Sequence, residues 1–114
     1  METRYYLENG SCYITIYGPM TNTTLVRIKD RVKDALKEGV REVWVNCEAM
    51  TDVDLSILGS LALYQHVLEE RNVKLTLLHL NPQQQNILVK NQLDTILPVA
   101  NETELPLAHN WNKI

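Results

Sequence analysis

The sequence predicts a single α/β domain with a mostly parallel five-stranded sheet, an N-terminal antiparallel hairpin strand and about four helices. Two observations support this prediction. Short runs of alternating apolar residues recur along the chain, and segments with apolar residues at helical spacing separate the later runs. Alternating strands and helices are typical of a parallel sheet with right-handed crossovers. No repeat or linker divides the 114 residues, so one domain is expected over residues 1–114.

Two short strands open the chain. Residues 4–7 form the first, and the second follows at residues 12–17, where apolar side chains alternate with polar or aromatic ones. The dipeptide Asn9-Gly10 lies between them, and both of its residues tolerate a positive φ. This pattern predicts a hairpin, so the first strand is expected to be antiparallel to the second.

A helix is expected next, followed by a strand that is covered on both sides. Thr21 or Asn22 can cap the helix, because either side chain can accept a hydrogen bond from its free N–H groups. Gly39 fits the left-handed residue that ends many helices. In residues 42–48 the apolar side chains face one way while Trp44 faces the other, which is typical of a strand inside a parallel sheet.

The second half of the chain continues this alternation. The helix of residues 55–70 carries an apolar side, and residues 73–80 alternate as a fourth strand. Asn81 and Pro82 are typical of a helix start, since proline needs no hydrogen bond at the first helical position. Residues 96–99 include a proline, which cannot donate inside a sheet, so they predict a last strand at the sheet edge.

The C-terminal residues predict a final short element. Asn101 and the residues up to Glu104 could open a fourth helix, which Pro106 would interrupt. The tail after about residue 108 is expected to be loose.

Composition argues against several classes of protein. The formal net charge of −3 differs from the basic excess that nucleic-acid binders usually carry. No apolar run reaches the ~20 residues of a membrane span, and the N-terminus lacks a signal-peptide core. We therefore expect a cytoplasmic protein without a membrane span. Cys12 and Cys47 have no spacing typical of a metal site or a disulfide framework, and we expect both to be buried.

Residues 50–59 join the third strand to the following helix and place Ser56 at the start of that helix. A helix N-terminus suits a phosphate, because its free N–H groups and its dipole favour negative charge. Asp52 and Asp54 precede Ser56, and the turn and its helix contain no Lys or Arg. Phosphorylation would add about −1.5 to −2 charges to this acidic turn and change how a partner binds. The alternative is that Ser56 only caps its own helix.

Leu55 and Ile57, on either side of the serine, allow two interpretations. If they are exposed beside Leu58, they form an apolar patch that favours standing contact with another protein. The alternative is that Leu55 or Ile57 folds under into the core, as apolar side chains commonly do.

Three separated stretches of the chain together resemble one known family. Residues 50–59 are similar to a switch loop in which an apolar pair and an Asp precede Ser-Ser-Gly and then Leu-Gly. Asn81-Pro82 followed by Ile87-Leu88 resembles the helix after the family's fourth strand, and residues 93–99 resemble its closing segment. The family is the STAS domain, the fold of anti-sigma-factor antagonists and of the cytoplasmic tails of sulphate transporters. The similarity covers nearly the whole chain.

The resemblance implies a protein-interaction switch. In that family a partner anti-sigma kinase phosphorylates the switch serine, which by motif position is Ser56 here. Leu55 stands where the family usually has the first Ser of the pair, Ile57 replaces the Gly, and Thr21 occupies a place where Asp is frequent. The expected partner-binding residues are Asp52, Asp54, Leu55, Ser56, Ile57, Gly59, Ser60 and Thr21.

The implied partner is a protein, either an anti-sigma factor or serine kinase or another signalling or transporter subunit. The alternative function is a non-phosphorylated STAS scaffold, or a subunit of a transporter or signalling complex. The sequence leaves the oligomeric state open, with a homodimer as one option.

An enzyme would need a different set of residues. Asp52 and Asp54 could bind Mg²⁺ or act as an acid–base pair. However, no pattern links His66, His79 or His109 to Ser56 as the base that activates a nucleophile. The sequence also lacks a glycine-rich phosphate loop and a metal-ligand cluster. We therefore expect no catalytic residue, no metal and no cofactor.

Overall fold

The computed structural model describes residues 3–100 and shows a five-stranded sheet in the order β1-β2-β3-β4-β5. Three α-helices and one 3₁₀ helix accompany the sheet within this range. The fourth helix expected at residues 101–104 and the tail after about residue 108 lie outside the described residues. Within residues 3–100, no helix has the length and apolar character needed to cross a membrane.

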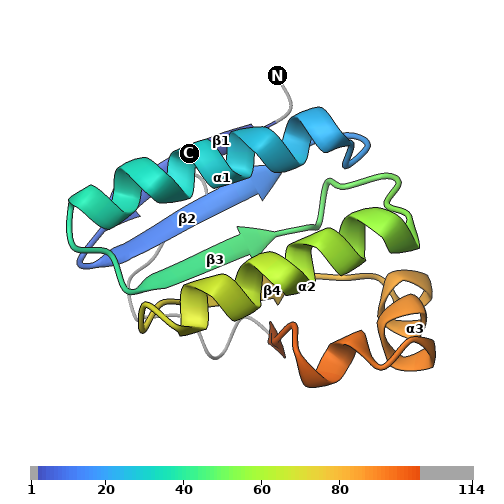
Figure 1. Ribbon diagram of the computed structural model, residues 1–114. Helices are drawn as coiled ribbons and strands as arrows, with labels where there is room; N and C mark the ends of the chain where they lie inside the picture. The colour runs from blue at the N-terminus through green and yellow to red at the C-terminus, as the bar shows by residue number, and fades with distance from the viewer. Residues whose placement is uncertain (1–2, 101–114) are drawn as a thin grey trace.

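The strands and helices alternate after the first two strands. Their bounds are β1 Thr3–Glu8, β2 Ser11–Ile16, α1 Asn22–Lys37, β3 Glu42–Asn46, α2 Leu55–Glu69, β4 Lys74–Leu78, α3 Pro82–Lys90, η1 Leu93–Thr95 and β5 Val99–Ala100. β1 is antiparallel to β2, and every later strand is parallel to the one before it. α1 and α2 lie side by side on one face of the sheet, and α3 lies at the end to which the parallel strands point (Figure 1).

The turn between β1 and β2 sets the register of the first pair. Asn9 and Gly10 have φ angles of 50° and 81°, the left-handed backbone that a two-residue turn needs. Glu8 therefore lies opposite Ser11, and the ladder continues along both strands. Because this turn follows the right-handed twist of the strands, they pair over their full length of six residues.

The main core lies between the sheet and the two long helices. Ile14, Val45 and Leu77 come from three neighbouring strands and are buried in it. The helices add buried side chains at helical spacing: Leu25, Ile28, Val32 and Ala35 from α1, and Leu58, Leu61, Ala62 and Leu68 from α2. Burying one large apolar side chain is worth about 1.5–3 kcal/mol, so this layer holds the helices on the sheet.

The opposite face of the sheet carries a smaller cluster. Tyr13, Trp44 and Leu78 are buried there, with Tyr6 and Ala100 packed against them. Trp44 is only 8% exposed. This confirms the prediction that the third strand is covered on both sides, as strands inside parallel sheets usually are.

The last strand differs from the prediction. The sequence predicts a strand at residues 96–99, but only Val99–Ala100 pairs with β4. Leu93–Thr95 forms a 3₁₀ turn just before it. Pro98 has no N–H to donate, so only its carbonyl joins the sheet, where it accepts a hydrogen bond from the backbone N of Leu77 at 2.9 Å.

The side chain of Gln65 completes the sheet where β5 is too short to reach. Gln65 is fully buried in α2, and its Oε1 accepts a hydrogen bond from the backbone N of Leu75 at 2.7 Å. Lys74 donates toward β3 and Leu77 toward β5, so the N–H of Leu75 points to the side of β5. The Gln65 amide therefore stands in for a missing strand carbonyl, and its Nε2 is satisfied by Glu69 at 3.0 Å.

We predict that Gln65→Leu destabilises the domain by about 1–3 kcal/mol, because the buried N–H of Leu75 loses its acceptor. Gln83→Leu is the matched control, since Gln83 is exposed on α3 and its replacement should change stability by less than about 0.5 kcal/mol. Urea unfolding followed by circular dichroism measures both. Equal stabilities of the two variants would show that the Gln65 amide does not support β4.

Candidate functional site

The predicted site lies at the end of the sheet to which β2 and β3 point. The loops that follow these two strands, residues 17–21 and 47–54, lead directly into α1 and α2. Both helices start at this end and run back along the sheet (Figure 1). In parallel α/β sheets the carboxyl ends of the strands bring loops from distant parts of the chain together, and ligands commonly bind there.

Backbone hydrogen bonds join these two loops. The N of Gly18 donates to the O of Ala49 at 3.0 Å, and the O of Gly18 accepts from the N of Thr51 at 2.9 Å. The N of Met20 donates to the O of Asp52 at 2.7 Å. Gly18 has a φ of 75°, which costs glycine little. The loops therefore form a short extension of the sheet, and Asp52 is held beside the residue that precedes Thr21.

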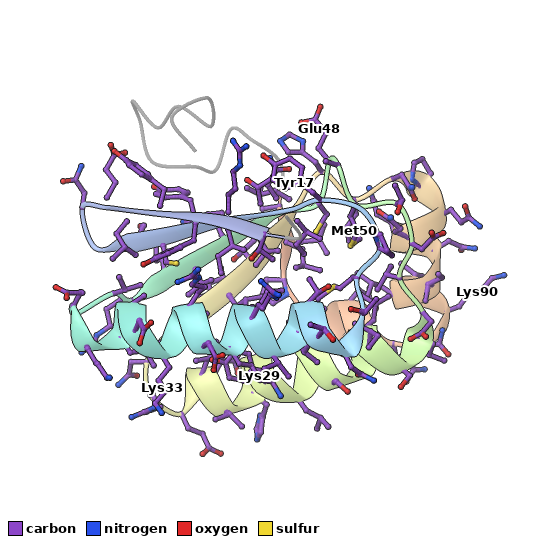
Figure 2. All side chains as sticks on the ribbon, turned by 90° about the horizontal axis from the view of Figure 1, so that it is seen from above. Tyr17, Lys29, Lys33, Glu48, Met50 and Lys90 are labelled. Carbon is purple, nitrogen blue, oxygen red and sulfur yellow. The ribbon has the colours of Figure 1, made fainter. Side chains whose placement is uncertain are left out.

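Two buried methionines pack on the inner side of this extension. Met20 and Met50 are 4% and 5% exposed and belong to the main core. Figure 2 shows Met50 inside the molecule, whereas Glu48 points away from the sheet into solvent. The loops are consequently anchored on their inner side, while the acidic side chains remain on the outer surface.

Asp54, and not Ser56, caps α2. The Oδ1 atom of Asp54 accepts a hydrogen bond from the backbone N of Ile57 at 2.9 Å, and the helix begins at Leu55. The alternative that Ser56 caps its own helix is therefore wrong. A carboxylate is a strong acceptor for the free N–H groups of a first turn and also opposes the positive end of the helix dipole. Asp54 thus takes the capping role and leaves the serine hydroxyl uncommitted.

Ser56 is the second residue of α2 and is exposed. The described part of the chain offers its hydroxyl no hydrogen-bond partner. Glu48, Asp52 and Asp54 are exposed in the preceding loop, so the surface around the serine is acidic. Two opposing effects would act on a phosphate here. The helix N-terminus favours a negative charge by about 0.3–1 kcal/mol, and the nearby carboxylates disfavour it by a comparable amount.

The two apolar neighbours of Ser56 point in different directions. Ile57 is 5% exposed and lies in the core, whereas Leu55 is 46% exposed. The structure thus leaves one apolar side chain, and not two, on the surface of this turn. Gly59 and Ser60, one turn further along α2, are half-buried.

Thr21 lies on the same end of the sheet and caps α1. Its side chain accepts a hydrogen bond from the N of Thr24 at 3.3 Å, and the Thr24 hydroxyl accepts one from the N of Thr21 at 3.1 Å. These reciprocal bonds form a capping box. Thr21 is exposed, so the structure brings it to the same surface as the turn of Asp52.

An apolar groove beside the turn was not expected from the sequence. It has a volume of about 360 Å³ and is lined by Gly59, Ala62, Leu63, His66, Leu93 and Ile96. Leu63 is 71% exposed, and Ile96 on the other wall is 43% exposed. Leu55, Gly59, Leu63 and Val67 follow one another at intervals of four residues, which places them along one side of α2. We name the exposed residues Leu55, Leu63, Val67 and Ile96 the apolar stripe.

The histidines and cysteines are placed apart from the turn. His66 lies in α2 with its Nε2 3.6 Å from Glu70 Oε1, and both side chains are exposed. His79 follows β4 with a φ of 60°, and His109 lies outside the described residues. Cys12 and Cys47 are buried, and burial raises the pKa of each thiol to about 12. Within residues 3–100 no three His, Cys, Asp or Glu side chains form a group that could hold a metal ion.

We predict that Asp54→Ala destabilises the domain by about 0.5–2 kcal/mol through loss of the cap, while Asp54→Asn has a much smaller effect because the amide oxygen can still accept. Asp52→Ala is the matched control, since it removes an exposed carboxylate from the same turn without removing a cap. Thermal and urea unfolding of the three variants measure the differences. A loss of stability in Asp52→Ala as large as that in Asp54→Ala would contradict the capping role.

Comparison with known proteins gives one family and several related structures. The family model of the STAS domain matches residues 4–105. The anti-sigma factor antagonist SpoIIAA in its unphosphorylated form has a TM-score of 0.70 at 18% identity, with 90% of each chain covered. The Bacillus cell fate determinant SpoIIAA in its phosphorylated form has a TM-score of 0.66 at 18% identity, with 90% of this chain and 94% of that chain covered.

A further structure is TM1081 from Thermotoga maritima, a candidate anti-sigma factor antagonist. It has a TM-score of 0.73 at 16% identity and covers 90% of this chain and 87% of its own. At such identities the likeness of the structures shows a shared fold. The comparison with curated protein sequences found no match.

Proposed function

The chain belongs to the STAS domain family, and we propose that it is a non-catalytic protein-interaction switch of the cytoplasm. Its partner binds the turn of Asp52 to Ser56, and phosphorylation of Ser56 controls that binding. The partner is an anti-sigma factor or serine kinase-like protein, so the switch acts in the regulation of transcription. No cofactor or metal takes part.

The exposed hydroxyl of Ser56 is the observation that carries this proposal. It stands at the second position of α2, while Asp54 already supplies the cap. A kinase can therefore reach the hydroxyl without opening the helix. SpoIIAA, which shares the fold, has been solved in both an unphosphorylated and a phosphorylated form. This supports a switch in which the same backbone accommodates both states.

The charge of the site explains how a phosphate would act on binding. A phosphoserine adds about −1.5 to −2 charges to a surface that already carries Asp52 and Asp54. The core does not include Ser56, so the fold keeps its packing. A partner that contacts this surface experiences the whole change, and a tenfold shift in affinity requires only about 1.4 kcal/mol.

The shape of the surface extends the binding site beyond the predicted residues. Asp52, Asp54, Leu55 and Ser56 form its acidic end, with Thr21, Gly59 and Ser60 beside them. The apolar stripe continues this surface along α2 toward η1. The prediction that Ile57 contacts the partner is wrong, because its side chain is 5% exposed and packs in the core, where it holds the first turn of α2 in place. The surface fits a partner with an apolar centre and a basic rim facing the turn.

We predict that Ser56→Asp changes the affinity for the partner by about tenfold or more while stability changes by less than about 0.5 kcal/mol. Thr23→Asp is the matched control, because Thr23 is the exposed second residue of α1 and receives the same charge at the same helical position. Isothermal titration with the partner purified from the native host measures affinity.

Phosphorylation is tested by incubating the chain with ATP and the serine kinase-like partner, followed by mass spectrometry. The phosphate should appear on Ser56 and be absent from Ser56→Ala. Modification of another residue, or equal partner affinity of the wild type and Ser56→Asp, would reject the switch.

A second candidate function is a non-phosphorylated scaffold or subunit in a transporter or signalling complex. The apolar stripe favours it, because an exposed side chain such as Leu63 suits lasting contact more than reversible docking. Ser56→Asp separates the two functions, because a scaffold would keep its complex in this variant and a switch would not. Leu63→Asp should cause the scaffold to lose its complex.

A further inference from the structure

β1 is the edge strand on one side of the sheet in the part of the chain that the structure describes. In a two-residue turn the carbonyl of the first residue accepts from the N–H of the fourth, so Glu8 and Ser11 form a hydrogen-bonded pair. Along an antiparallel ladder, pairs of opposite residues that exchange backbone hydrogen bonds alternate with pairs that do not. Thr3, Tyr5 and Leu7 therefore fall in non-bonded pairs and direct their N–H and C=O groups away from β2. Among the described residues, β1 has no neighbouring strand on that side.

The opposite edge of the sheet differs from β1 within residues 3–100. β5 has only two residues and follows Pro98, which cannot donate. The next N–H of β4 that points to this edge belongs to Leu75, and it donates a hydrogen bond to Oε1 of Gln65. β1 in contrast is six residues long and contains neither a proline nor a bulge. Prolines and bulges are two of the devices by which proteins protect long edge strands, and β1 lacks both, although it carries the charged residues Arg4 and Glu8. Within the described residues its edge can therefore pair with another chain.

A basic groove of about 450 Å³ runs between the start of β1 and α1. It is lined by Thr3, Arg27, Asp30, Arg31, Lys33, Asp34 and Lys37. Four cations and two carboxylates give this lining a formal net charge of +2, although the whole chain carries −3. The guanidinium of Arg31 lies 4.5 Å from the ring centroid of Tyr5, so a β1 side chain restrains one of the cations at the groove.

We propose that β1 accepts an extended acidic segment of a partner protein as an added strand, with the acidic side chains in the basic groove of α1. Main-chain hydrogen bonds to Thr3, Tyr5 and Leu7 give such binding its affinity, and the groove selects the side chains on one face of the added strand. This surface is separate from the turn of Ser56, so it does not depend on the phosphorylation switch.

A second copy of this chain fits the edge less well than an acidic segment. Two β1 strands paired about a two-fold axis would bring two grooves of formal charge +2 toward each other. Like charges facing one another across an interface oppose association. An acidic segment meets the same groove with opposite charge. Charge complementarity therefore decides between the two occupants.

The test uses a fluorescein-labelled peptide of about eight residues in which Glu alternates with Val, because this length spans β1. Fluorescence anisotropy should show saturable binding to the full chain that weakens as salt rises. The same peptide with Lys in place of Glu should not bind. Equal binding of the two peptides would overturn the proposal.

Backbone pairing is tested by Tyr5→Pro, which removes an outward N–H without removing a bond to β2. Tyr5→Ala is the matched control, because it also loses the ring on Arg31 but keeps the N–H. We expect Tyr5→Pro to bind the Glu peptide at least about tenfold more weakly than Tyr5→Ala. Similar affinities of the two variants, with both folded by circular dichroism, would show that β1 does not pair with the peptide.

The groove is tested by the double variant Lys33→Glu and Lys37→Glu, which leaves β1 unchanged and keeps the proposal testable if Tyr5→Pro unfolds. Lys33 on α1 lines the groove, whereas Lys90 lies on α3 at the other end of the molecule (Figure 2). Lys90→Glu is thus a control for reversing a single charge outside the groove. Only the double variant should lose binding by about tenfold or more.

Amide hydrogen exchange by NMR separates an added strand from attraction by charge alone. The bound Glu peptide should protect the amides of Thr3, Tyr5 and Leu7. Binding without protection of these amides would overturn the proposal. Dimerisation of the chain alone that Tyr5→Pro abolishes would also overturn it, because the occupant would then be a second copy.

Discussion

The three backbone hydrogen bonds between the loops after β2 and β3 are the constraint on which the candidate site depends. Gly18 serves as donor to one residue and acceptor for another, and Met20 binds the carbonyl of Asp52. These bonds use main-chain groups, so the position of the acidic turn does not rely on any surface side chain. They also tie the start of α1 to the start of α2. Thr21 and Ser56 are 35 positions apart in the sequence, and these bonds bring them to one surface.

The two long helices are capped by different kinds of side chain. Thr21 satisfies α1 through a reciprocal pair with Thr24, whereas Asp54 satisfies α2 through its carboxylate alone. Because Asp54 performs this role, Ser56 remains on the surface with its hydroxyl exposed. Asp54 thus stabilises the helix from within the molecule, whereas Ser56 is available to a binding protein. A charge added at Ser56 acts mainly on what lies outside the molecule.

Much of the fold could be predicted because it follows from local patterns. The alternation around Ile14 and the turn at Asn9-Gly10 are visible in a few consecutive residues, and the position of Ser56 at the start of a helix is confirmed. The sequence could not show that Asp54 would be the cap, because both residues are good acceptors near the same helix start. The bond from Leu75 to Gln65 escaped prediction because it joins residues on two elements and replaces a strand.

The apolar groove was missed for a related reason. Leu63 lies on a helix that is apolar on several sides, so the sequence does not show which of its apolar side chains stay exposed. In the structure Leu63 lines the groove with Leu93 and Ile96 and still remains 71% exposed. Sequence periodicity identifies an apolar side of a helix, but it cannot say which of two such sides the rest of the chain will cover.

The unequal edges of the sheet limit how large an assembly built from it can become. Growth of a sheet into a fibre needs two open sides on every unit, one to receive a strand and one to offer the next. In the described part of this molecule, the Gln65 amide and Pro98 close one side. Among residues 3–100, β1 is then the edge that strand addition would use, and one added strand occupies it. Under the proposal, each copy of the chain would therefore accept one added strand.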